Sequence, residues 1–166
     1  MTVNGYTITG DHYFFLNYYQ LLDVTNVTEA MQGRTQNFPA FLVTQYELFH
    51  YFELCKKTKK NAALMKARGV GCSEINASFM ANLYSTRRNS LGLIAAYDKR
   101  KLDPTLEKIW QELSFLNDHT QGGFFKLRQN IDRQDSKRAS HYKIVNSQKI
   151  ETGFMSQLTG IIADNP

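Results

Sequence analysis

The residues with the clearest capacity for chemistry lie in one polar run, RQNIDRQDSKRASHYK, residues 128–143. It holds five cations, two carboxylates and His141, with few apolar side chains. Guanidinium and ammonium groups stabilise negative charge on a phosphate, and a histidine can transfer a proton near neutral pH. The run is therefore a candidate either for binding a polyanion or for cleaving one.

The charge of the chain is unevenly distributed. The net charge is +5, but residues 1–55 have one cation against five carboxylates. Residues 56–68 hold six cations and no acid, and residues 121–150 hold seven cations against two acids. Such zones favour contacts with the phosphates of RNA or DNA, or with an acidic protein surface, although lysine-rich runs also serve only to keep a surface hydrated. The candidate nucleic-acid-binding residues are Lys56, Lys57, Lys59, Lys60, Lys126, Arg128, Lys137, Tyr142 and Lys143, with the tyrosine stacking on a base.

The elements that must position these residues are expected to be helices. Apolar residues recur at helical spacing over residues 11–22, from Pro39 to about residue 57, over 74–97, and after Asp103–Pro104. The basic zone 56–68 is expected to continue as a helix to Gly69. Residues 142–145 fit either a strand or a continued helix, and residues 155–162 suggest a last helix or a docked tail. The sequence thus predicts an all-α, single-domain helical bundle of five to seven helices over residues 1–166.

One interruption stands out in the expected helix 74–97. Arg87, Arg88 and Asn89 fall among its inward-facing apolar residues. If they are buried, they need anionic or carbonyl partners, because an unpaired charge is costly away from water.

Two segments of the C-terminal half resemble HEPN-type helical domains. They are LYSTRRNSLGLIAAYDKRKLD, residues 83–103, and FFKLRQNIDRQDSKRASHYK, residues 124–143, on either side of a helix that contains the only tryptophan. Many HEPN-type domains are dimeric, metal-independent ribonucleases. The resemblance implies a homodimer in which Arg133 or Arg138 stabilises charge on the phosphate and His141 transfers a proton.

Other chemistries have less support in the sequence. Glu47 and His50 form one Glu-x-x-His motif, but a di-iron bundle needs a second such motif, and none occurs. Cys55 and Cys72 lack metal-binding spacing and are interpreted as free thiols. No phosphate-binding glycine loop or nucleophile elbow is present, so neither a metal nor a cofactor is predicted.

Targeting signals are also missing from the sequence. The first residues, MTVNGYTITGDHYFF, lack a basic segment followed by an apolar one, and no apolar run is long enough to span a bilayer. We therefore expect a cytoplasmic protein with no membrane partner.

Three functional hypotheses follow. The first is a small basic helical protein that binds nucleic acid or an acidic protein partner, in a phage or host-defence setting. The second is a HEPN-like ribonuclease or its inactive relative, so enzymatic activity is left open. The third is a protein-interaction module that uses the N-terminal helices, because residues 1–55 hold 12 of the 21 aromatic residues.

Overall fold

The structure is a computed structural model that describes residues 2–3, 5–8, 10–23, 35–67, 69–120 and 130–163. This part of the chain contains four helices and eight strands, and its largest sheet has four strands. The protein is therefore a mixed α/β protein, and the predicted all-α helical bundle is wrong. The fold divides into two compact units, Met1–Ile75 and Asn76–Pro166. The expectation of a single domain stays a prediction.

The N-terminal unit alternates short strand pairs with helices. Strands β1 (Thr2–Val3) and β2 (Tyr6–Thr7) pair antiparallel and precede helix α1 (Gly10–Asn17). Strands β3 (Leu21–Asp23) and β4 (Thr35–Asn37) pair in the same way and precede helix α2 (Val43–Thr58). Helix α3 (Cys72–Thr86) contains the division between the units.

Helix α2 ends at Thr58, close to the predicted end near residue 57, and the expected helical continuation to Gly69 is wrong. Lys59 adopts the left-handed conformation, with φ of 55°, and its amide donates to the carbonyls of Cys55 and Lys56. This conformation closes a helix at its C-terminus. The basic zone therefore does not continue as a helix, and residues 60–67 are irregular.

Aromatic rings form the core of the N-terminal unit. The ring of His12 stacks on Phe49 with centroids 4.5 Å apart and lies 5.6 Å from Phe41. Phe15 lies 5.5 Å from Phe49. The His12 side chain is only 1% exposed, and its burial, followed by the charge of His50, lowers its pKa to about 4. Part of the aromatic excess of residues 1–55 therefore serves internal packing.

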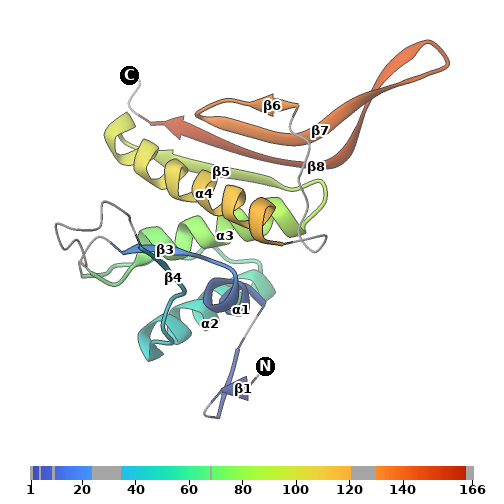
Figure 1. The fold of residues 1–166 in the computed structure, drawn as a ribbon. Helices are drawn as coiled ribbons and strands as arrows, with labels where there is room; N and C mark the ends of the chain where they lie inside the picture. Colours follow the sequence, from blue (N-terminus) through green and yellow to red (C-terminus); the bar gives the residue numbers. More distant parts are fainter. Residues whose placement is uncertain are drawn as a thin grey trace. The chain divides into compact units, whose positions relative to one another are not determined.

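The C-terminal unit is built on the four-stranded sheet. Its strands are β5 (Leu91–Ala96), β6 (Ile131–Asp132), β7 (Ser136–Val145) and β8 (Gln148–Ile162). Their order is β5-β8-β7-β6, with β5 parallel to β8 and the other pairs antiparallel. Helix α4 (Lys99–His119) packs against β5 and β8 and crosses one face of the sheet (Figure 1).

The absence of a side chain at Gly160 allows α4 to approach the sheet. A Cβ added to Gly160 on β8 would lie 2.8 Å from Leu106 Cδ1 and 3.1 Å from Leu102 Cδ2. The apolar stripe of α4 meets this surface, and Leu102, Leu106, Ile109, Leu113 and Leu116 are all buried. The helix begins at Lys99 rather than at Asp103, because the Asp98 carboxylate accepts a hydrogen bond from the Lys101 amide and caps it.

The predicted helix 74–97 is a helix followed by a strand. Helix α3 ends at Thr86, and the exposed residues Arg87, Arg88 and Asn89 form the turn into β5, with Asn89 at a φ of 54°. The apolar residues of 91–96 then continue as a strand. A short apolar run fits a buried helix or a strand equally well from periodicity alone, which explains the error.

The segment predicted as a last helix or a docked tail is also a strand. Residues 155–162 belong to β8, which pairs with β7 through the two-residue turn Asn146–Ser147. Both turn residues have positive φ, 50° and 63°. This is the turn geometry that matches the twist of two antiparallel strands.

Candidate nucleic-acid interface

The polar run singled out in the sequence belongs to a long hairpin. Strand β6 pairs with β7 only at Lys137 and Arg138, and β5 pairs with β8 only from Gln157 onward. In the described chain, residues 140–153 are therefore a two-stranded ribbon with no flanking strand, which we call the ribbon. It projects from the sheet at the upper right of Figure 1.

A bulge redirects the ribbon where it leaves the sheet. The register passes from Arg138↔Gln157 to Ser140↔Gly153, so three residues of β8 oppose Ala139 alone. Extra residues in one strand bend it and increase its twist. Phe154, inside the bulge, accepts a backbone hydrogen bond from Asn89 at 3.1 Å, and the Arg88 guanidinium lies 5.6 Å from its ring centroid. The α3–β5 turn therefore anchors the base of the ribbon.

An ion pair joins the two strands next to this bulge. Arg138 donates from Nε to Glu151 Oε1 at 2.6 Å and from Nη2 to Oε2 at 3.1 Å. Ser140 donates to the same Oε1 at 2.5 Å. The bonds from Arg138 and then Ser140 lower the pKa of Glu151 to about 2, and the bond to Glu151 raises the pKa of Arg138. Both groups therefore stay charged and neutralise each other over the physiological pH range.

The remainder of the ribbon is cationic. Residues 140–150 of the ribbon contain no carboxylate, and its one acid, Glu151, pairs with Arg138. Lys143 is opposite Ile150 in the register and Lys149 is opposite Ile144. Because side chains alternate between the faces of a strand, the two lysines lie on opposite faces of the ribbon.

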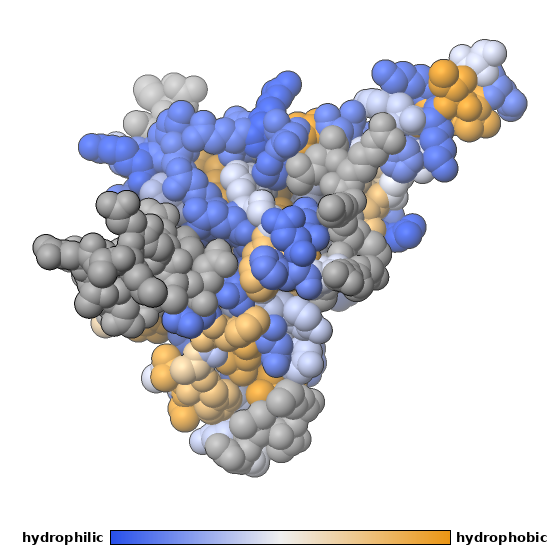
Figure 2. All heavy atoms as spheres, viewed as in Figure 1, coloured by the Kyte–Doolittle hydropathy of each residue, from blue (hydrophilic) through white to orange (hydrophobic). Residues whose placement is uncertain are grey.

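The end of the ribbon also carries apolar side chains. Ile144 is 81% exposed, and Val145 and Ile150 are about half exposed. Figure 2 shows hydrophobic and hydrophilic atoms together at this end. The Lys149 ammonium lies 4.2 Å from the centroid of the Tyr142 ring, so one face of that ring is occupied. The tip therefore combines positive charge with aliphatic surface.

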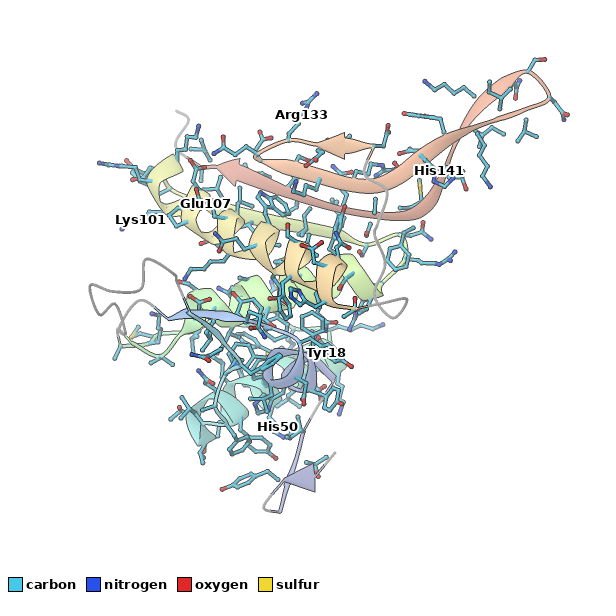
Figure 3. All side chains as sticks on the ribbon, in the orientation of Figure 1. Tyr18, His50, Lys101, Glu107, Arg133 and His141 are labelled. Atoms are coloured by element: carbon cyan, nitrogen blue, oxygen red, sulfur yellow. The ribbon has the colours of Figure 1, made fainter. Side chains whose placement is uncertain are left out.

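The residues proposed for catalysis occupy different parts of the C-terminal unit. Arg133 is exposed between β6 and β7, and its amide donates to the Ser136 carbonyl at 2.8 Å. Arg138 is held by Glu151 and by Gln157, whose Oε1 accepts its Nη1 at 2.8 Å. His141 lies at the start of the ribbon, and Figure 3 shows it well apart from Arg133. The catalytic roles and the HEPN resemblance that implies them stay predictions.

Several candidate nucleic-acid-binding lysines are paired within the protein. Lys137 forms an ion pair with Asp132 and lies 5.0 Å from the centroid of the Trp110 ring. In the N-terminal unit, Lys56 pairs with Asp11, and Lys57 lies 3.9 Å from Glu53. Lys59 and Lys60 are exposed. Lys126 and Arg128 lie outside the described residues.

The described residues contain neither a metal-binding cluster nor a helix suited to span a bilayer. No group of three His, Cys, Asp or Glu side chains gathers there in a form that could hold a metal ion. His50 Nε2 lies 3.2 Å from the Thr7 carbonyl, Glu47 is exposed, and both cysteines are free thiols. Within the same ranges, none of the helices combines the length and apolar character needed to span a bilayer.

Reasoning from the sequence missed Lys149, Ile144 and the turn as parts of one projecting surface. The available signal was the polar pair Asn146–Ser147, with Ile144 and Val145 before it and Ile150 and Thr152 after it, because a two-residue polar turn between β-branched residues indicates a hairpin. A scan against protein-family models and searches of curated proteins and of solved structures find no match to this chain. Any function of this chain is therefore inferred from its own geometry and charge.

Proposed function

We propose that this protein binds double-stranded DNA with the ribbon of residues 140–153. The observation that carries the proposal is a projecting two-stranded ribbon in which residues 140–150 contain no acid. Phosphates attract such a surface and release counterions when they bind it.

The dimensions of the ribbon suit a groove of DNA. The major groove of B-form DNA is about 12 Å wide and 8.5 Å deep, and it admits a two-stranded β-ribbon. From His141 to Val145 the ribbon advances four residues, about 14 Å at 3.4 Å per residue. A ribbon that enters tip first can therefore reach the floor of the groove. Lys143 and Lys149, on opposite faces, then each point toward one of the two phosphate backbones.

Double-stranded DNA is favoured over the other nucleic acids for two reasons. The major groove of A-form RNA is too deep and narrow for side chains to read. Single strands are bound largely by stacking on free aromatic faces. Tyr142 is the aromatic residue of the ribbon, and Lys149 covers one face of its ring.

An acidic protein partner is the second candidate. The exposed aliphatic side chains of Ile144, Val145 and Ile150 favour it, because they add an apolar contact that a phosphate backbone does not need. Thymine methyl groups on the groove floor can also receive such side chains, so we place the protein partner second.

Binding of a labelled duplex at 50 mM and 200 mM salt tests the proposal. Two phosphate contacts by the ribbon lysines predict an affinity about 12-fold weaker at the higher salt, and further contacts steepen this dependence. A single-stranded RNA and a single-stranded DNA of equal length serve as comparisons. Stronger retention of a single strand than of the duplex, or no retention of the duplex at 50 mM salt, contradicts the proposal.

A further inference from the structure

Strand β5 forms one edge of the four-stranded sheet. Among the described residues its pairing partner is β8 alone, along Leu91–Ala96. Proteins commonly protect such edges with charged residues, proline or bulges, because unpaired backbone groups can pair with another chain. The six residues of β5, LGLIAA, include no charge and no proline.

The backbone of β5 shows which groups face outward. The carbonyls of Ser90 and Ala96 accept hydrogen bonds from Gln157 and Ala163, so these even-numbered positions point their backbone groups toward β8. Backbone direction alternates along a strand. Leu91, Leu93 and Ala95 therefore direct their amides and carbonyls toward the open edge.

The side chains of the same three residues also share one face. Gly92 and Leu158 are opposite in the register, and a Cβ at Gly92 would collide with Leu158, on the face that α4 covers. Leu91, Leu93 and Ala95 lie on the other face, where Leu91 is 61% and Leu93 is 53% exposed. The edge thus offers backbone hydrogen bonds and an adjoining apolar strip.

We propose that β5 pairs antiparallel with β5 of a second copy of this chain, with Leu93 on the two-fold axis. In that register Leu93 faces Leu93 of the second copy, and Leu91 faces Ala95. The Leu93 pair and the two symmetry-related pairs of Leu91 with Ala95 all join residues whose backbone groups point outward. Each of these three pairs exchanges two hydrogen bonds, as antiparallel pairing requires. The two sheets become one continuous sheet across the axis.

The chemistry of the edge favours a second copy over a charged partner. A strand without charge meets no repulsion from its own copy, and it offers nothing to the phosphates or carboxylates that the ribbon attracts. The pairing also brings the exposed strips of Leu91, Leu93 and Ala95 from both copies together on one face, which removes apolar surface from water. This inference is independent of DNA binding.

Replacing Leu93 with a charged residue tests the axis directly. Residues opposite each other in such a pair have Cβ atoms about 5 Å apart, so Leu93→Lys places two like charges together, and so does Leu93→Glu. We expect wild type, without nucleic acid, to have twice the 19.1 kDa chain mass by light scattering, and each variant to have the single-chain mass. An equimolar mixture of the two variants should regain the doubled mass. Leu54→Lys, at a leucine 58% exposed on α2, is the control that should leave the doubled mass intact.

Hydrogen exchange checks the same pairing without any variant. The amides of Leu91, Leu93 and Ala95 should be protected at micromolar protein concentrations and should lose protection on dilution. A wild type of single-chain mass, rapid exchange of these amides at high concentration, or a Leu93→Lys variant that keeps the doubled mass would each overturn the proposal.

Discussion

Removal of the two ribbon lysines should weaken DNA binding by a calculable amount. We consider the double variant Lys143→Ala with Lys149→Ala. Neither side chain has a carboxylate partner within the described residues, and both are on an exposed ribbon, so the variant should fold as the wild type does. Lys149 loses only its contact with the Tyr142 ring.

The magnitude follows from counterion release. Each phosphate contact contributes about 0.9 to the slope of log affinity against log salt concentration. If each lysine contacts one phosphate, the slope becomes shallower by about 1.8. At 0.1 M salt this corresponds to an affinity about 60-fold lower, or about 2.4 kcal/mol.

Fluorescence polarisation of a labelled duplex across a salt series measures both quantities. The variant with Lys143→Arg and Lys149→Arg preserves the charges and should keep the wild-type slope. The variant with Lys59→Ala and Lys60→Ala removes two exposed cations from the other basic zone and should leave the slope unchanged. An unchanged slope in the ribbon variant, or an equal loss in the Lys59 and Lys60 variant, would refute the assignment of the ribbon as the binding surface.

Three further predictions concern stability. Because the pKa of Glu151 in the folded protein is lowered to about 2, the contribution of its carboxylate to the free energy of unfolding is complete above pH 4.5 and is lost as the pH falls toward 2. In urea unfolding, Glu151→Gln should therefore lose less stability than wild type over this pH range. Because the folded pKa of His12 is lowered to about 4, wild type should lose about 3 kcal/mol of stability between pH 6.5 and 4, and His12→Phe should lose much less in the same titration. Gly160→Ala should lower the free energy of unfolding by about 1 to 3 kcal/mol, measured by Trp110 fluorescence, because its Cβ would meet Leu102 and Leu106. The control Gly10→Ala, with nothing within 4 Å of its Cβ, should change this free energy by less than about 0.5 kcal/mol. Equal effects at the two glycines would count against this packing.

The sequence correctly indicated part of the local structure. The apolar stripe after Pro104 predicted the buried face of α4, because one helix face can be read from the spacing of its own residues. The run 128–143 was identified as a concentration of charge, since charge follows from composition. Residues 91–96 were predicted as helix and residues 155–162 as a helix or a docked tail, because their apolar runs carry no signal of the strand that pairs with them.

The candidate site depended on contacts between distant residues. Sequence alone determined that residues 136–150 are cationic and without acid. Only the tertiary structure decided that Arg138 is neutralised by Glu151, that Lys137 is paired with Asp132, and that Lys143 and Lys149 lie on opposite faces of a projecting ribbon. The physical reason is that strand register and ion pairing join residues separated along the chain, so no local pattern specifies which charges remain available to a partner.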